Sequence, residues 1–125
     1  MSIYTVSIVR GDDVARQVRE AVNLLGGMER FVKPGDRVLV LGAGTIGVLA
    51  AVAAKSRGAR VYVADVAEKK LQFAMDSFGL EGTLLNDSPE HFLEQVEAVT
   101  GGDGFDVTIE AVGLPSTFQN CIDAA

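Results

Sequence analysis

The stretch from Arg37 to Asp65 constrains the fold of this chain more than any other segment; it reads RVLVLGAGTIGVLAAVAAKSRGARVYVAD. It begins with the apolar run Val38–Leu41, which is short enough for a strand buried on both faces. Glycines follow at 42, 44 and 47, and after them come an apolar helical segment, a second apolar run and an acid. A strand, a Gly-x-Gly-x-x-Gly turn, a helix and an acid about twenty residues on are the fingerprint of a dinucleotide-binding unit.

Each glycine of this turn has a separate physical role. Gly42 allows the chain to leave the strand sharply, Gly44 removes a side chain where a diphosphate approaches the backbone, and Gly47 lets the helix lie close to the strand. The first amides of the helix then point at the phosphates. We predict that Gly42, Gly44, Thr45, Ile46 and Gly47 form the cofactor-binding turn, with the amides near Thr45 and Ile46 directed at the phosphates. A tight strand–helix turn without a ligand is the alternative.

Asp65 is expected to select the sugar of the ligand. It ends the second strand, where a carboxylate accepts hydrogen bonds from both ribose hydroxyls of an adenosine. Its negative charge would also repel a 2′-phosphate, so we expect NAD rather than NADP.

These residues resemble the nucleotide-binding half of the medium-chain dehydrogenases of the zinc alcohol and polyol dehydrogenase type. The resemblance extends from about Lys33 to the C-terminus. It rests on the segments KPGD at 33–36, GAGTIG at 42–47, VAD at 63–65, GFDV at 104–107 and EAVG at 110–113. It implies a Rossmann-like fold with NAD as cofactor.

The resemblance also implies roles outside the glycine turn. Many family members carry a lysine five residues after the ribose-binding acid, and Lys70 stands at that position. Lys70 is therefore expected to reach a ribose hydroxyl, with a solvated helix cation as the alternative. The loop of Ala111, Val112 and Gly113 is expected beside the nicotinamide half. In the family, the catalytic zinc and its Cys, His or carboxylate ligands belong to a separate domain.

The chain itself offers little catalytic chemistry. Its single cysteine, Cys121, and its single histidine, His91, are thirty residues apart and make no plausible tetrahedral zinc set. We expect His91 to face solvent and Cys121 to be a small buried apolar residue. Glu110 and Asp106 read as polar residues at strand ends. We therefore predict no catalytic residue, no metal ligand and no zinc.

Composition excludes several classes of partner. The net charge is −6 and there is no basic cluster, so nucleic acid and acidic membrane surfaces are disfavoured. The sequence contains neither an apolar run of membrane-spanning length nor a signal-peptide pattern. One cysteine in 125 residues excludes an internal disulfide and is typical of the reducing cytoplasm.

The N-terminal residues are predicted to form a strand–helix extension over 1–36, followed by a nucleotide-binding core over 37–125, in one domain of residues 1–125. Tyr4–Val9 is rich in β-branched residues, and an amphipathic stripe over 14–25 predicts a helix that Gly26–Gly27 ends. Residues 1–38 resemble the start of a different, poorly characterised family, from which nothing functional is carried over. The chain is therefore a candidate composite, natural or engineered, joined near Lys33–Val38.

The predicted fold is α/β: a doubly wound, Rossmann-like three-layer sandwich around a mostly parallel sheet of about five strands. The N-terminal strand is placed beside the strand at 105–111, because that edge would otherwise be open to pairing. A homodimer that exchanges this strand is the alternative. Ser88-Pro89 predicts a helix start. In the last helix, Phe118, Cys121, Ile122 and Ala125 are expected on the inner face.

We therefore predict an NAD(H)-binding module of dehydrogenase type, lacking the catalytic zinc domain and without catalysis of its own. Three alternatives remain: an oxidoreductase component that needs a partner domain, an inactive composite folding scaffold, and an S-adenosylmethionine-binding methyltransferase-like domain. The last class also uses a glycine loop after its first strand and an acid ending its second.

Overall fold

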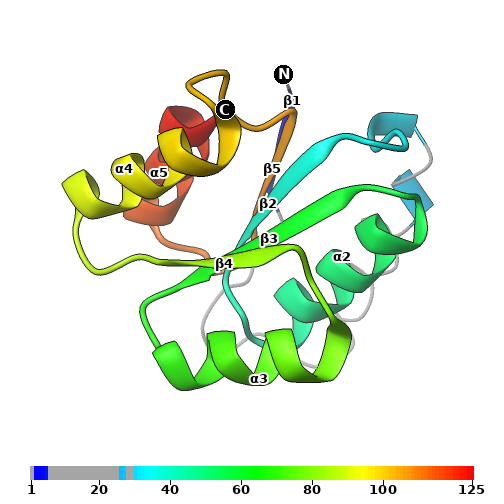
Figure 1. Cartoon of the computed structure of the whole chain (residues 1–125), viewed down its shortest axis with the longest axis horizontal. Helices are drawn as coiled ribbons and strands as arrows, with labels where there is room; N and C mark the ends of the chain where they lie inside the picture. The colour runs from blue at the N-terminus through cyan, green and yellow to red at the C-terminus, as the bar shows by residue number, and fades with distance from the viewer. Residues whose placement is uncertain (1, 6–25, 28–29) are drawn as a thin grey trace.

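The computed structural model describes residues 2–5, 26–27 and 30–125, which form a sheet covered by helices on both faces (Figure 1). The sheet has the order β1-β5-β2-β3-β4, and every neighbouring pair is parallel. Its strands are β1 (Ser2–Thr5), β2 (Arg37–Leu41), β3 (Arg60–Asp65), β4 (Gly82–Leu85) and β5 (Val107–Glu110). The doubly wound parallel sheet and its strand order are as the sequence predicts.

The N-terminal strand lies where it was predicted. In the register of β1 and β5, Ser2 is opposite Val107 and Thr5 is opposite Glu110. Strand β1 therefore pairs within the chain on the far side of β5 from β2. The rest of the predicted strand, Val6–Val9, and the predicted helix over 14–25 lie outside the described residues. The division into a 1–36 extension and a 37–125 core stays a prediction.

The helices form the two outer layers of the sandwich. Helices α2 (Thr45–Ser56) and α3 (Glu68–Phe78) pack on one face of the sheet, and α4 (Pro89–Thr100) and α5 (Pro115–Ala124) pack on the other (Figure 1). Among the described residues, no helix has the length and apolar character that crossing a membrane requires.

Alternation along β2 explains why its whole run is apolar. Val38 and Val40 pack on the α2–α3 side, whereas Leu39 and Leu41 pack on the α4–α5 side. All four are 0–1% exposed. A strand with helices on both faces needs apolar residues at every position, since successive side chains point to opposite faces.

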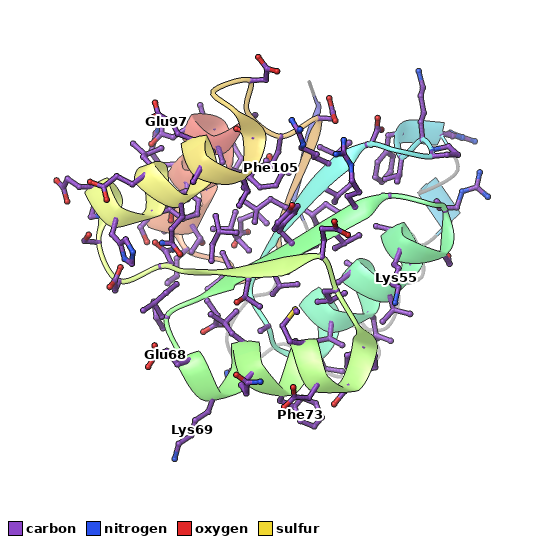
Figure 2. The ribbon with its side chains drawn as sticks, viewed as in Figure 1. Lys55, Glu68, Lys69, Phe73, Glu97 and Phe105 are labelled. Carbon is purple, nitrogen blue, oxygen red and sulfur yellow. The ribbon has the colours of Figure 1, made fainter. Side chains whose placement is uncertain are left out.

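The two helical layers are packed differently. Helix α2 buries only small residues, namely Gly47, Ala50, Ala51 and Ala54, so it lies close to the sheet. The opposite layer is filled by Phe92 and Phe105, which are 0% and 2% exposed. Figure 2 shows Phe105 between the sheet and the α4–α5 layer. The close approach of α2 matters for the site, because the glycine turn begins this helix.

Two sequence predictions are wrong. Gly26–Gly27 is helical, as are Arg30 and Phe31, so the two glycines do not end the helix there. Phe31 packs on the core beside the buried Val32, and such packing outweighs the cost of about 1 kcal/mol per helical glycine.

The inner face of α5 is the second correction. Its buried residues are Thr117, Cys121 and Ala124, whereas Phe118 and Ile122 are 44% and 42% exposed. Cys121 is buried as predicted. The cause is polar: the Thr117 hydroxyl is held by a strand carboxylate, and this bond fixes the rotation of the helix.

Side chains also finish element ends. From α4, the Gln95 amide contacts β4 twice: its Oε1 accepts from the Leu85 N–H at 2.9 Å and its Nε2 donates to the Leu85 carbonyl at 2.8 Å. Lys55 of α2 donates to the carbonyls of Phe78 and Gly79, at the C-terminal end of α3 (Figure 2). Ser88 caps α4 as predicted, accepting from the His91 N–H.

Candidate functional site

A cleft of about 450 Å³ opens at the carboxyl ends of the parallel strands. From β2 the chain winds outward through β3 and β4 and then returns to place β5 on the other side of β2. Ligands of open α/β sheets bind at such a reversal of strand order. The residues lining the cleft are Leu41, Gly42, Ala64, Asp65, Val66, Lys70, Asn86, Asp87, Ser88, Pro89, Val112, Leu114, Ser116, Thr117 and Asn120.

Gly42 lies under a second loop. Its φ is +111°, and a Cβ placed there would stand 2.9 Å from Val112 Cγ2 and 3.0 Å from the Ala111 carbonyl oxygen. Both the backbone conformation and the close neighbour therefore require glycine. The turn after β2 and the turn after β5 are thus in direct contact.

Gly44 and Gly47 are glycines for different reasons. A Cβ on Gly47 would lie 1.7 Å from the Gly42 carbonyl oxygen, so this glycine is required by packing between the helix and the turn. A Cβ on Gly44 would meet no atom within 4 Å. Its backbone is extended, with φ −77° and ψ −173°, which any residue adopts. The fold therefore leaves Gly44 unexplained, and a ligand that approaches the backbone would explain it.

The amides at the start of α2 are open. The first helical bond runs from the Val48 N–H to the Gly44 carbonyl at 2.9 Å. Among the described residues, the N–H groups of Gly44, Thr45, Ile46 and Gly47 have no acceptor. These groups carry the positive end of the helix dipole and suit an anion.

Asp65 lies at the mouth of this loop. Its Oδ2 accepts from the Ala43 N–H at 2.8 Å, and its Oδ1 accepts from the Ala67 N–H at 2.9 Å. One amide of the glycine turn is therefore taken by the protein itself. Each carboxylate oxygen accepts two hydrogen bonds, so both keep capacity for a ligand hydroxyl. The sequence indicated the position of this acid but not its bond to the turn.

Lys70 also lines the cleft. It stands in the first turn of α3 and is exposed. Its side chain has no hydrogen-bond or ion-pair partner within the part of the chain that the structure describes. The structure brings Lys70 and Asp65 into one cleft, and the contact of Lys70 with a ribose stays a prediction.

The loop of Ala111, Val112 and Gly113 is held by a carboxylate that sequence reasoning did not assign. Glu110 Oε1 accepts from the Val112 and Gly113 N–H groups, both at 2.7 Å, and from the Thr117 hydroxyl at 2.9 Å. Glu110 is only 4% exposed. Asp106, by contrast, ties strand ends together, accepting from the Arg37 N–H at 2.8 Å.

Several cleft residues were missed by sequence reasoning. Asn86, after β4, donates from Nδ2 to Asn120 Oδ1 of α5 at 3.0 Å and so joins two elements across the cleft. Asp87 hydrogen-bonds to His91, and this bond lowers the pKa of Asp87 below its ordinary value. The Asn86–Asn120 contact joins elements far apart in the sequence and leaves no periodic or motif signal.

Little in the structure suggests a metal centre or a nucleophile. Within the described ranges, no three His, Cys, Asp or Glu side chains are placed to hold a metal ion. Burial raises the pKa of the Cys121 thiol to about 12, against a smaller lowering by the Thr108 hydroxyl. A thiol that stays protonated is a poor nucleophile and metal ligand.

Fold and cleft together define a Rossmann-like domain. The family model for the zinc-binding dehydrogenases matches residues 45–125, which is more than half of the chain. The chain belongs to this family.

Its relatives are dehydrogenases. It is 39% identical over 90 residues to L-threonine 3-dehydrogenase of Aeromonas salmonicida, covering 71% of this chain and 26% of the relative. With L-galactonate-5-dehydrogenase of Escherichia coli it shares 38% identity over 92 residues, 74% of this chain and 26% of the relative. This chain thus spans about a quarter of the length of these curated relatives.

Solved structures agree. The zinc-dependent alcohol dehydrogenase 2 of Streptococcus pneumoniae superposes with a TM-score of 0.73 and 30% identity, covering 81% of this chain and 31% of that one. A structure described as an NAD-dependent alcohol dehydrogenase gives 0.72 and 30%, covering 84% of this chain and 31% of the other.

Proposed function

We propose that this chain binds NAD(H) as the nucleotide-binding module of a zinc-type dehydrogenase. The supporting observation is that open amides at 44–47 stand next to the Asp65 carboxylate, at the switch point of the sheet. The amides offer four donors to a diphosphate, and the carboxylate offers acceptors to a ribose. A glycine at 44 that nothing in the fold requires supports the same reading.

The other site residues follow from the cleft. Lys70 reaches the ribose beside Asp65, and Val112 adds an apolar wall to the same cleft. Because Val112 shares its cleft with Asp65 and Lys70, we assign the loop 111–113 to the adenosine half of the ligand. This revises the expectation from sequence, which put the loop beside the nicotinamide.

NAD is proposed in preference to NADP. Two carboxylates, Asp65 and Asp87, line the cleft against one lysine, Lys70. A 2′-phosphate would bring about two further negative charges beside them, and like charges at close range are costly.

We further propose that the chain does not turn over alcohols by itself. Bound NAD supplies the hydride acceptor, but the family's zinc needs three or four ligands around one ion. This sequence has one cysteine, which is buried, and one histidine, which bonds to Asp87. Polarisation of a substrate oxygen would then come from a partner domain.

Isothermal titration with NADH, NADPH and S-adenosylmethionine tests these proposals, read beside thermal unfolding with each ligand. We expect NADH alone to bind and to raise the unfolding temperature, because a ligand that binds only the folded state stabilises it. Binding of S-adenosylmethionine alone would overturn the proposal in favour of a methyltransferase-like domain. No binding of any ligand would favour an inactive scaffold. Alcohol-dependent NADH formation would contradict the lack of autonomous catalysis.

A further inference from the structure

The side chain of Glu110 presents an unusual arrangement for the end of a buried strand. It is a carboxylate, 4% exposed, and no Lys or Arg side chain among the described residues pairs with it. Burying a charge without a counter-ion is costly unless hydrogen bonds replace the lost water. Here one oxygen, Oε1, receives three donors at 2.7, 2.7 and 2.9 Å.

These three donors come from a loop and a helix that form one wall of the cleft. Val112 and Gly113 belong to the turn after β5, and Thr117 is in the first turn of α5. Val112 and Thr117 both line the cleft. A single carboxylate therefore fixes the turn and the helix start relative to each other.

The same loop sets the position of the glycine turn. The loop lies directly against Gly42. A Cβ on Gly42 would stand 2.9 Å from Val112 Cγ2 and 3.0 Å from the Ala111 carbonyl oxygen. The Ala111 N–H also donates to the Leu41 carbonyl at 2.8 Å, immediately before Gly42. Movement of the loop would thus be felt at both the apolar wall and the phosphate-binding turn.

We propose that Glu110 is a positioning residue of the dinucleotide site, whose carboxylate presets the loop 111–113 and the start of α5 for the adenosine half of the ligand. This proposal rests on the proposed NAD(H) function. The charge is the important feature: a carboxylate oxygen accepts several N–H and O–H donors at once, and such bonds are stronger than neutral ones. An amide in its place would keep one acceptor oxygen but lose the charge.

The test compares Glu110→Leu and Glu110→Gln with the matched control Thr108→Val. Thr108 lies two residues before Glu110 on β5 and is 0% exposed. Its hydroxyl donates one hydrogen bond to the Cys121 carbonyl. The control therefore removes a buried polar contact from the same strand without touching the loop. AMP and NADH affinities are measured by calorimetry, and hydrogen exchange reports the Val112 and Gly113 amides.

We expect Glu110→Leu to weaken AMP and NADH binding by the same factor, about tenfold. Glu110→Gln should rescue part of this loss, to about threefold. Exchange at the Val112 and Gly113 amides should speed up in both variants. Thr108→Val should keep wild-type affinity even where its unfolding temperature falls, which separates positioning from general stability. If Glu110→Leu does not fold, Glu110→Gln and Thr117→Val carry the same comparison.

The outcomes that would overturn the proposal are distinct. Wild-type AMP affinity in a folded Glu110→Leu or Glu110→Gln variant would overturn the positioning role and leave the proposed function standing. Loss of NADH binding with unchanged AMP binding would overturn the assignment to the adenosine half. Failure of the wild type to bind either ligand would overturn the proposed function, and the positioning role with it.

Discussion

The turn after β2 and the turn after β5 meet at the switch point of this sheet, and each contains a group of neighbouring backbone amides. The turn after β2 leaves the amides of residues 44–47 without an acceptor in the described chain, whereas the turn after β5 has its amides filled by Glu110. Unpaired amides are tolerated only where solvent or a ligand completes them. From this difference we propose that the turn after β5 is a fixed wall of the cleft and that the turn after β2 receives the ligand.

The largest expected effect on stability and binding comes from a change at Gly47, where the turn after β2 packs on α2. Gly47→Ala places a Cβ where the Gly42 carbonyl oxygen stands, at 1.7 Å, so α2 must move away from the turn. We expect a loss of more than about 3 kcal/mol in the free energy of unfolding, together with loss of NADH binding. Urea unfolding measures the first quantity. Wild-type stability would show that the turn adapts freely.

Asp65 accepts a hydrogen bond from one amide of the glycine turn. Asp65→Asn tests both this bracing of the turn and the proposed preference for NADH. The amide nitrogen would face an N–H donor of Ala43 or Ala67, so one hydrogen bond is lost at a cost of about 1–3 kcal/mol. Removal of the charge should also reduce the preference for NADH over NADPH, measured as a ratio of dissociation constants. An unchanged ratio would show that Asp65 only braces the turn.

Gly44→Ala tests the difference between the two turns directly. The amides after β2 have no acceptor in the described chain, whereas those of Val112 and Gly113 are bonded to Glu110. A Cβ at this position meets no protein atom, so stability should stay within about 1 kcal/mol of wild type. NADH affinity should fall at least about tenfold, because the methyl group occupies the approach to the amides. Fluorescence titration of NADH gives the affinity. Equal affinity in this variant would argue that no diphosphate approaches residue 44.

The smallest effect concerns the layer behind the filled turn. Because burial raises the pKa of Cys121 to about 12, its thiolate is scarce at pH 8. Alkylation by iodoacetamide should be slower than that of a free thiol and should keep accelerating with pH beyond the ordinary thiol range. The raised pKa of Cys121 also makes the free energy of unfolding depend on pH. The stability present at neutral pH is lost as the pH rises above the pKa of the thiol in the unfolded chain. Fast labelling at pH 8 would show that α5 opens readily.

Sequence reasoning found the glycine turn and the loop 111–113, but it missed the Glu110 carboxylate that holds this loop, for a physical reason. Gly42, Gly44 and Gly47 form a local pattern with a known purpose, and β1 was placed by asking which strand covers an otherwise open edge. Glu110 has no such pattern, because its partners include a hydroxyl seven residues away whose direction depends on the rotation of α5.

The same cause explains the error in α5. Apolar size favoured Phe118 and Ile122 as inward residues, yet Thr117 and Cys121 face the sheet. Thr117 is tied to Glu110, and this polar contact decides the rotation. Periodicity predicts that a helix has a buried face, but small polar residues held by long-range bonds can decide which face it is.

The Gln95 amide on the outer edge of β4 has a consequence for how this protein behaves at high concentration. Its carboxamide meets Leu85 with one donor and one acceptor, as a neighbouring peptide group would. A foreign strand arriving at that end of the sheet would have to displace it before zippering alongside. Gln95 is thus expected to block aggregation through this edge strand. Its replacement should show first as turbidity rather than as weaker ligand binding.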